Sequence, residues 1–384
     1  MKKLFYLFAS LSVLLAACGP VATVTVPTPT ETSVASATPQ LPTVTPPPQA
    51  TATATQPSTV NGPSNFPAGV NPLTGLMVAD PALLDRRPMV IKVSNLPRTV
   101  RPQWGLSLAD IVFEYYTEEG STRFAAVFYG NDAKMVGPIR SGRFIDADIV
   151  RGYQAVFAFG SAFEAEMDRF LNSEFANRLV IEGASTPLFR YDPNGLAYLM
   201  VNTADLSAYA TKKGLQNVRQ NLDGMTFKTE VPAGGQPGAQ VYVRYSGSIY
   251  NRWDYDPSSG IYLRFADKAD DFNNSNEQYT QATDRLTNQL IAFDNVVVLF
   301  VNHELYGPGI YDILLSGSGD AYAFRDGMMY KVRWQRNDTD VVTLTNPDGT
   351  PFPFKPGTTW FEVVGMGSQV KQITQGDQFI HFMP

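Results

Sequence analysis

The sequence of 384 residues has few of the side chains that metal and redox sites need, with one cysteine and two histidines. A single cysteine excludes an intramolecular disulfide framework, a zinc site built only from protein thiolates, and a C-x-x-C redox pair. Two histidines exclude a three-histidine metal centre. Basic residues are also scarce: 30 Lys and Arg stand against 36 Asp and Glu, and a net charge of −6 argues against a nucleic-acid partner. We therefore expect no metal, no cofactor and no nucleic acid.

The N-terminus carries a targeting segment. Lys2 and Lys3 precede an apolar run over residues 4–15, which is too short to span a bilayer. The run ends in small residues before Cys18, a pattern typical of a bacterial lipobox. We expect residues 1–18 to be a lipoprotein signal peptide, with Cys18 lipidated and the protein anchored to the extracytoplasmic face of the cell membrane. An ordinary cleaved signal peptide with an incidental cysteine is the alternative.

Residues 19–69 are expected to form a disordered stalk. Residues 20–63 contain 12 Thr and 10 Pro among 44 positions, and Glu31 is their only charge. Proline fixes φ and removes backbone donors, and few large apolar side chains are available to bury, so no core can form. Where extended, such a chain could hold a domain up to ~130 Å from the membrane. The threonine density permits O-glycosylation without establishing it.

Residues 70–214 are predicted to form an α/β or α+β N-terminal domain. Near-continuous apolar runs predict strands with both faces covered, at residues 88–93, 111–116, 124–129 and 154–159. Helices are expected at 144–152, 161–171 and 203–213, the second beginning with a capping box at Ser161 and Glu164. Strands and helices in this order favour a layered domain.

The C-terminal part is predicted to be mainly β. Residues 215–240, which end in a stretch rich in Pro and Gly, are expected to be a linker to a domain over 241–384. Short strand-like runs recur in that domain, with hairpin-type turns at Asp326-Gly327 and Asp348-Gly349. This pattern favours a small barrel or sandwich.

Several motifs follow one another through both parts: NPLTGL at 71–76, RPQWGLSLAD at 101–110, FE at 113–114, EGSTRF at 119–124, GPIRSGR at 137–143, NVVV at 295–298, YDILLSGSG at 311–319 and TW at 359–360. Together they resemble the YerB-like family of bacterial lipoproteins, whose members join an N-terminal and a C-terminal domain of unknown function. The family implies an envelope lipoprotein without an established reaction. Family members carry Pro-His-Asn where this chain has Leu196-Ala197-Tyr198, so a histidine that acts in relatives would be missing here.

The most site-like segment is 137–143, where glycines allow close backbone approach and two arginines offer forked donors to a carboxylate or phosphate. Polar side chains at neighbouring strand ends are expected to converge on it. The residues predicted to line a ligand-binding pocket are Arg101, Gln103, Glu119, Arg123, Arg140, Ser141 and Arg143, with Thr122 beside them. The alternative is a structural ion-pair network that joins Arg140 and Arg143 to Asp146, Glu114 or Glu119.

Two further motifs favour structural roles. Ser161 follows a strand, but phenylalanines at 159 and 163 replace the glycines of a nucleophile elbow, so we expect a helix N-cap. His303-Glu304 lacks the second histidine of H-E-x-x-H, which argues against a zinc peptidase.

Two other groups leave alternatives open. Asp267, Asp270 and Asp271 lie in an oxygen-rich loop that could hold Ca²⁺, although its spacing fits no EF-hand. Aromatic residues such as Tyr250 and Trp253 are expected in a β-rich core, with a glycan-binding or partner-binding surface as the alternative.

The sequence contains no complete catalytic constellation. The leading hypothesis is therefore a non-catalytic surface lipoprotein that binds a cell-wall component or an envelope protein through an arginine-lined polar pocket. The competing hypothesis is a hydrolase or transferase acting on cell-wall material, with Glu114, Glu119 or Asp146 as acid and base.

Overall fold

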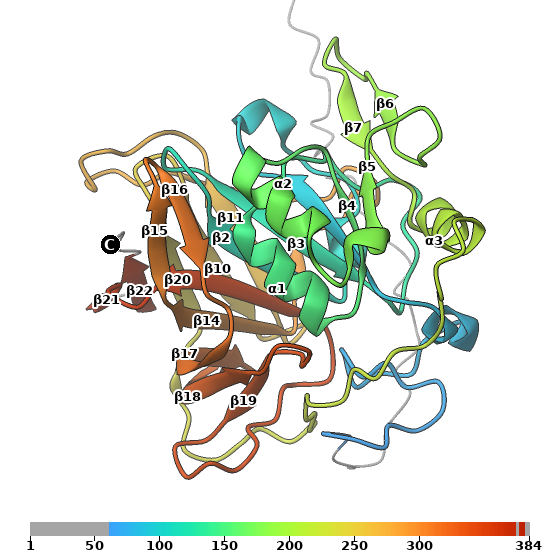
Figure 1. Ribbon diagram of the computed structural model, residues 1–384. Helices are drawn as coiled ribbons and strands as arrows, with labels where there is room; N and C mark the ends of the chain where they lie inside the picture. The colour runs from blue at the N-terminus through green and yellow to red at the C-terminus, as the bar shows by residue number, and fades with distance from the viewer. Residues whose placement is uncertain (1–60, 374–375, 381–384) are drawn as a thin grey trace, which may run out of the picture. The chain divides into compact units, whose positions relative to one another are not determined.

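The computed structural model describes residues 61–373 and 376–380, so Cys18 and most of the predicted stalk lie outside the described residues. In the described part there are three α-helices, α1 (Phe144–Gly152), α2 (Glu164–Leu171) and α3 (Thr203–Lys212), and 22 strands (Figure 1). Short 3-10 turns are η1 (Pro81–Asp85), η2 (Arg98–Val100), η3 (Leu106–Leu108) and η4 (Ala176–Arg178). All three helices lie in the N-terminal half and the C-terminal half is mainly strands, which confirms the predicted fold class.

The larger sheet has 11 strands drawn from both halves of the sequence. In spatial order they are β19 (Thr343–Thr345), β18 (Met328–Arg336), β17 (Gly317–Arg325), β14 (Asn295–Val301), β20 (Thr359–Gly365), β2 (Ile111–Tyr116), β3 (Thr122–Phe128), β1 (Met89–Ser94), β4 (Val156–Phe159) and β5 (Leu179–Ile181), with β8 (Gln236–Pro237) beside β18. Strand β20 joins the halves, because it pairs in parallel with β14 on one side and with β2 on the other. The C-terminal half therefore extends the N-terminal sheet instead of closing into a barrel or sandwich of its own.

A second sheet of seven strands comes from the C-terminal half. Its strands are β12 (Tyr279–Gln281), β11 (Ile261–Asp267), β10 (Tyr250–Asp256), β9 (Gln240–Arg244), β22 (Gly376–Ile380) and β21 (Gln369–Ile373), with β13 (Ala292–Phe293) beside β11. Two hairpins stand outside both sheets: β6 (Phe189–Tyr191) with β7 (Tyr198–Met200), and β15 (His303–Gly307) with β16 (Ile310–Ile313).

Both faces of the larger sheet are buried. Along β20, Phe361 stacks on Phe113 at 4.7 Å in the core that also contains α1 side chains. The next residue back, Trp360, faces the other way and meets Trp253 of the smaller sheet at 5.2 Å. Figure 1 shows α1 and α2 lying across the front of the larger sheet. The result is a layer of helices, a mixed sheet and a second sheet. The central strands are mostly apolar because each face is covered, with Lys92, Glu114 and Glu362 as buried charged exceptions.

The folded unit includes residues that composition assigned to the stalk and to the linker. Asn61 pairs with Phe227 through hydrogen bonds of 3.0 and 2.8 Å, and the Phe66 ring contacts the Phe227 ring at 6.3 Å. Met225 and Phe227, inside the expected linker, are fully buried. The folded unit therefore begins before residue 70, and Leu222, Met225 and Phe227 of the expected linker pack in its core.

Helix α2 begins later than the sequence predicted. It starts at Glu164, and the Glu166 carboxylate accepts a hydrogen bond from Phe163 N at 3.0 Å. Ser161 instead lies before the helix, where its carbonyl accepts from Gly142 N at 2.7 Å. The predicted cap at Ser161 is wrong, because Phe163 is the residue that precedes α2 and Ser161 lies two positions further back.

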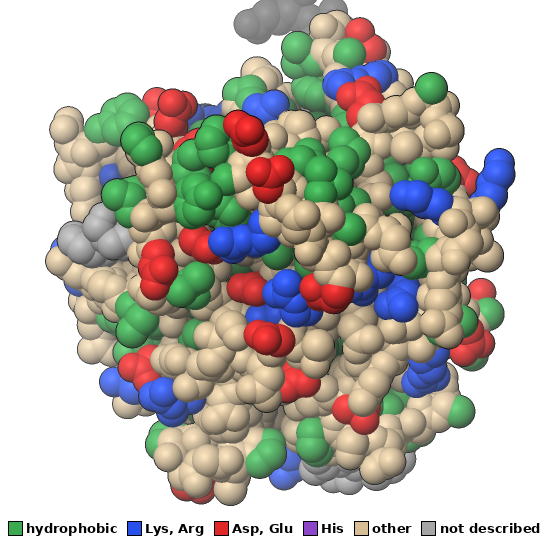
Figure 2. Space-filling model, viewed as in Figure 1, with side chains coloured by type: hydrophobic (Ala, Val, Ile, Leu, Met, Phe, Trp, Pro, Cys, Tyr) green, Lys and Arg blue, Asp and Glu red, His purple; other side chains and the backbone are tan. Residues whose placement is uncertain are grey.

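Hydrophobic side chains gather on the face shown in Figure 2, over α2 and the β15–β16 hairpin. Phe163, Leu305 and Tyr306 are more than half exposed there. No helix among residues 61–373 and 376–380 combines the length and the apolar character needed to cross a membrane.

Candidate ligand-binding site

The segment 137–143 runs along the end of β1 and leads into α1. Its backbone is tied to β1, because Arg140 N donates to Lys92 O at 3.0 Å. Gly142 lies so close to α2 that a Cβ at this position would meet the Phe170 ring at 2.7 Å. Glycine is therefore required here for packing, and the segment is fixed against both elements.

Arg123 and Arg143 converge on one carboxylate, that of Glu118. Arg143 Nε donates to Glu118 Oε2 at 2.7 Å, and Arg123 Nη2 donates to Glu118 Oε1 at 2.8 Å. Arg143 Nη1 also lies 3.6 Å from Glu166 Oε2. Burial opposes ionisation of Glu118, but the hydrogen bond from Arg143 and the charge of Arg123 prevail and lower its pKa. These contacts differ from the ion-pair network considered as an alternative, because Arg143 pairs with Glu118 and Glu166 and, among the described residues, Arg140 takes no part.

Asp146, one of the expected carboxylate partners, is fully buried. It caps α1 by accepting a hydrogen bond from Arg143 N at 2.6 Å, and it lies 3.1 Å from Lys92 Nζ. The Tyr115 hydroxyl accepts from Lys92 and donates to Asp146. Burial lowers the pKa of Lys92 to about 7, against the opposing charge of Asp146. Asp146 thus belongs to a closed group beneath the surface.

Glu114 is also fully buried, and it lies opposite Glu362 in the parallel pairing of β2 with β20. Glu114 Oε2 accepts from Arg264 Nη2 at 2.6 Å. Glu362 accepts from Trp253 Nε1 at 2.9 Å and from the Tyr245 hydroxyl at 2.9 Å. Burial, reinforced by the charge of Glu114, raises the pKa of Glu362 to about 8. Near neutral pH the Glu362 carboxyl therefore keeps its proton, beside Glu114 and Arg264.

Two polar hollows open near these networks. The first, which we name the Arg140 hollow, has a volume of about 470 Å³. Its charged lining residues are Arg98, Glu118, Glu119, Arg123, Arg140 and Asp270. The Arg140 side chain is exposed and has no carboxylate oxygen within 4.0 Å among the described residues.

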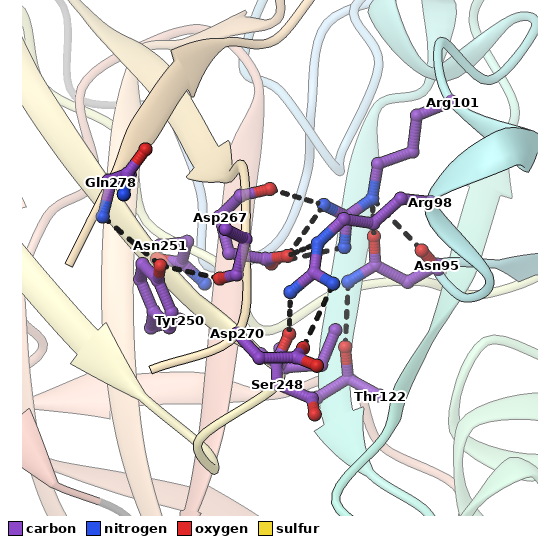
Figure 3. A network of polar contacts seen from close by, with 12 residues as sticks. Asn95, Arg98, Arg101, Thr122, Ser248, Tyr250, Asn251, Asp267, Asp270 and Gln278 are labelled. Atoms are coloured by element: carbon purple, nitrogen blue, oxygen red, sulfur yellow. Dashed lines mark hydrogen bonds and ion pairs between the residues drawn. The ribbon is translucent and has the colours of Figure 1, made fainter. Parts of the chain in front are cut away.

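The second hollow, which we name the Arg101 hollow, has a volume of about 340 Å³. Arg101 binds the Asp267 carboxylate with two hydrogen bonds, from Nη1 to Oδ2 at 3.0 Å and from Nη2 to Oδ1 at 3.1 Å. Arg98 Nε donates to the same carboxylate at 2.6 Å, and Figure 3 shows both guanidinium groups turned toward Asp267. Because Arg98 lines both hollows, the two are neighbours.

The predicted pocket residues are thus divided among three places. Glu119, Arg123 and Arg140 line the Arg140 hollow, whereas Arg101 and Gln103 line the Arg101 hollow. The other two lie outside both. Ser141 Oγ is 2.8 Å from Ser161 Oγ, and Arg143 is held by Glu118 and Glu166 beside a smaller hollow.

Residues of the hollows that the sequence did not single out come mostly from distant segments. Arg98 lies only three positions before Arg101, and its position in the same loop was a usable signal. Arg264 and Lys268 come from the C-terminal half, more than 160 positions away, and no local motif connects them to the loop. Their placement depends on the smaller sheet packing against the larger one.

The remaining candidates have structural partners. Asp270 accepts from Arg98 at 2.9 Å, and Asp271 accepts from Ser275 N at 3.1 Å and lies 3.5 Å from Arg244 Nη1. Within the part of the chain that the structure covers, no three His, Cys, Asp or Glu side chains are grouped as metal ligands. The aromatic pair Tyr250 and Trp253 is buried, at 1% and 0% exposure, which corresponds to the core role expected for them.

Comparison with known proteins identifies both halves of the chain. Residues 73–216 match a family described as the N-terminal domain of a protein of unknown function, DUF3048, and residues 241–361 match the C-terminal domain of the same family. The chain is 27% identical over 302 residues to YerB of Bacillus subtilis (strain 168), itself a proposed lipoprotein, with 76% of this chain and 85% of YerB covered.

A solved structure agrees with this assignment. The crystal structure of the YerB protein from Bacillus subtilis superposes with a TM-score of 0.65 at 26% identity, covering 77% of this chain and 96% of that one. The resemblance therefore extends through sequence and fold in both halves. The chain belongs to the YerB-like family, in which the N-terminal and C-terminal DUF3048 domains are joined in one protein.

Proposed function

We propose that this protein is a membrane-anchored extracytoplasmic lipoprotein that binds an anionic component of the cell envelope through the Arg140 hollow. Cys18 would carry the lipid, and the Thr/Pro-rich stalk would hold the folded unit away from the membrane. The lipobox pattern and the similarity to a proposed lipoprotein support the anchor.

The observation that carries the binding proposal is the state of Arg140. Arg98 and Arg123, the other arginines of the Arg140 hollow, are both paired with carboxylates, whereas Arg140 has no such partner among the described residues. Burial and then the charge of Arg143 lower the pKa of Arg123 to about 10, so the positive charges of these two arginines already repel each other. A ligand carboxylate or phosphate would supply the negatively charged partner that Arg140 lacks, and arginine binds both groups with forked hydrogen bonds.

The hollow suits an anion better than an uncharged sugar. Its lining contains Ser121, Thr122 and Ser248 beside the charged side chains, and none of the lining residues is aromatic. An aromatic face is the usual apolar platform for a sugar ring, so recognition here would rest on charge and hydrogen bonds.

The catalytic alternative has less support. It named Glu114, Glu119 or Asp146 as acid and base, but Glu114 and Asp146 are fully buried in different networks, and only Glu119 is exposed. Glu118 and Asp270, the other carboxylates that line the Arg140 hollow, are already paired with arginines. A buried carboxylate that is already hydrogen-bonded cannot reach a proton on an external substrate. We therefore favour binding over catalysis.

Replacing Arg140 with Ala tests the binding proposal. The purified lipidated full chain is incubated with an isolated envelope fraction, with inorganic phosphate as competitor. Loss of a charge-assisted contact is expected to weaken binding at least about tenfold, with an unchanged melting temperature because the side chain is exposed. Arg219→Ala is the matched control, since Arg219 is also exposed and lines neither hollow. Equal binding by both variants would refute the proposal.

The anchor is tested separately by labelling cells with a fatty-acid analogue. The wild-type protein should incorporate the label and Cys18→Ser should not, because Cys18 is the only thiol in the chain. Label on the Cys18→Ser variant would contradict lipidation at this residue.

A further inference from the structure

The Arg101 hollow draws its walls from both halves of the chain. The loop after η2 contributes Arg101 and Gln103, while β11 and the residue that follows it contribute Arg264, Asp267 and Lys268. Its volume of about 340 Å³ falls within the range of small-molecule sites. It is a different hollow from the one used in the proposed function.

The walls are rigid and polar. Gln103, Arg264 and Asp267 are 7%, 4% and 2% exposed. Gln103 Nε2 donates to Ser94 O at 3.1 Å, and the Asp267 carboxylate is fixed by Arg101 (Figure 3). Groups that are already ordered lose little entropy when a ligand arrives, so such a hollow is preorganised for binding.

Two donors in the hollow are not used by the protein. Arg264 lines the hollow, and Nη2, which donates to Glu114, is its one guanidinium nitrogen with a hydrogen-bond partner among the described residues. A guanidinium with donors to spare can give a charge-assisted hydrogen bond to a ligand acceptor. Lys268, at the rim, is exposed and has no carboxylate oxygen within 4.0 Å in the same part of the chain.

The charge of Asp267 does not oppose an anion, because Arg98 and Arg101 both pair with it. Pro102, Ala266 and Ala282 also line the hollow and supply a small apolar surface. The hollow therefore offers both cationic donors and room for a few aliphatic carbons.

We propose that the Arg101 hollow binds a small carboxylate with a short aliphatic part. The carboxylate accepts hydrogen bonds from the Arg264 guanidinium and Lys268, and the aliphatic part packs on Pro102, Ala266 and Ala282. Both a free acid and the C-terminal carboxylate of a short peptide have this chemistry.

The test compares an acid with its uncharged counterpart. N-acetyl-alanine and N-acetyl-alanine amide are titrated into the full chain and followed by calorimetry. A ligand of this size is expected to bind with a Kd of about 1 mM, and the amide at least about tenfold more weakly because it lacks the charge. Equal binding of acid and amide, or no saturable binding of the acid, would overturn the proposal.

Variants then locate the ligand. Lys268→Gln should weaken the acid about tenfold, and Ala282→Leu, which fills the apolar side, should abolish its binding. Lys212→Gln on α3 is the exposed-lysine control and should change nothing. If Ala282→Leu does not fold, the Lys268→Gln result and the acid–amide comparison still decide the question.

Arg140→Ala separates this site from the other hollow. The acid should bind this variant as it binds the wild type. Loss of acid binding in Arg140→Ala together with unchanged binding in Lys268→Gln would place the anion in the Arg140 hollow and refute the site proposed here. Propionate as a further probe distinguishes the two sources: binding as tight as that of N-acetyl-alanine indicates a free acid, and weaker binding indicates a peptide C-terminus.

Discussion

Two arginines only three positions apart in the sequence have different roles in the structure. Arg143 holds Glu118 and, through its backbone N–H, the cap of α1, whereas Arg140 faces solvent in the Arg140 hollow. Breaking a partly buried pair leaves an uncompensated charge behind, so replacing Arg143 affects folding. Replacing both arginines together would mix the two effects, and only Arg140 alone reports on binding.

The buried carboxyl pair of Glu114 and Glu362 gives a residue-level prediction for stability against pH. Folded Glu362 keeps its proton up to about pH 8, whereas in the unfolded chain it releases the proton near its ordinary pKa of 4.5. Between these values the folded state binds more protons, so this group's contribution to stability falls as pH rises. The contribution of Glu362 to stability is fully present below pH 4.5 and is lost as the pH rises to about 8.

Glu362→Gln removes this titration. The free energy of unfolding of the wild type, minus that of the variant, is expected to fall between about pH 5 and pH 8 by up to about 1.4 kcal/mol per pH unit. Urea denaturation at several pH values measures it. Glu164→Gln, at an exposed position in the first turn of α2, controls for the loss of a negative charge. Parallel pH curves for the wild type and Glu362→Gln would contradict the raised pKa.

At the level of elements, the strands with both faces covered were predictable and their partners were not. The apolar runs that became β1, β2 and β3 need only local sequence, because burial on both sides leaves no polar alternation. The pairing of β2 with β20 joins residues more than 240 positions apart, and nothing in either strand specifies the other. For this reason the network of Glu114 with Glu362 and Arg264 could not be read from the sequence.

In the candidate site, too, the local motif was predictable from the sequence and the partners of its side chains were not. Segment 137–143 was recognisable from its glycines and arginines, and three of the predicted residues do share one hollow. Glu118, the carboxylate that pairs with Arg143, was missed although its neighbour Glu119 was named. Glu119 has φ +52° in the turn before β3, and this turn leaves Glu119 exposed while Glu118 meets the arginines.

The contact between segment 137–143 and α2 yields a prediction at the element scale. In Gly142→Ala the new Cβ would lie 2.7 Å from the Phe170 ring, so either the loop or the helix must move. Overpacking of this kind costs about 1–3 kcal/mol of unfolding free energy. Gly160→Ala is a matched control in the neighbouring segment, because the nearest atom to its new Cβ would be Arg140 C, at an ordinary contact distance of 3.6 Å. Chemical denaturation of both variants measures the difference, and equal stabilities would show that the loop is not packed tightly on α2.

At the scale of the whole folded unit, the boundary between the two matched domains is not a boundary in the fold. Strand β20 from the C-terminal domain lies between β14 and β2, and its Phe361 covers Phe113. Without the C-terminal half, β2 would expose an unpaired edge and Glu114 would lose its ion pair with Arg264. Neither half has a complete core alone.

We therefore expect fragments 61–240 and 241–384 to lack cooperative thermal unfolding when produced separately, and to recover one cooperative transition when co-expressed. Fragment 61–384, which keeps both halves, is the control and should melt in a single transition. Circular dichroism melts and size-exclusion chromatography of the co-expressed pair provide the measurement. A sharp transition in 61–240 alone would mean that β2 tolerates the loss of β20, and that the two DUF3048 domains are physically separable after all. Recovery only on co-expression would mean that the shared sheet is what requires the two domains to occur together.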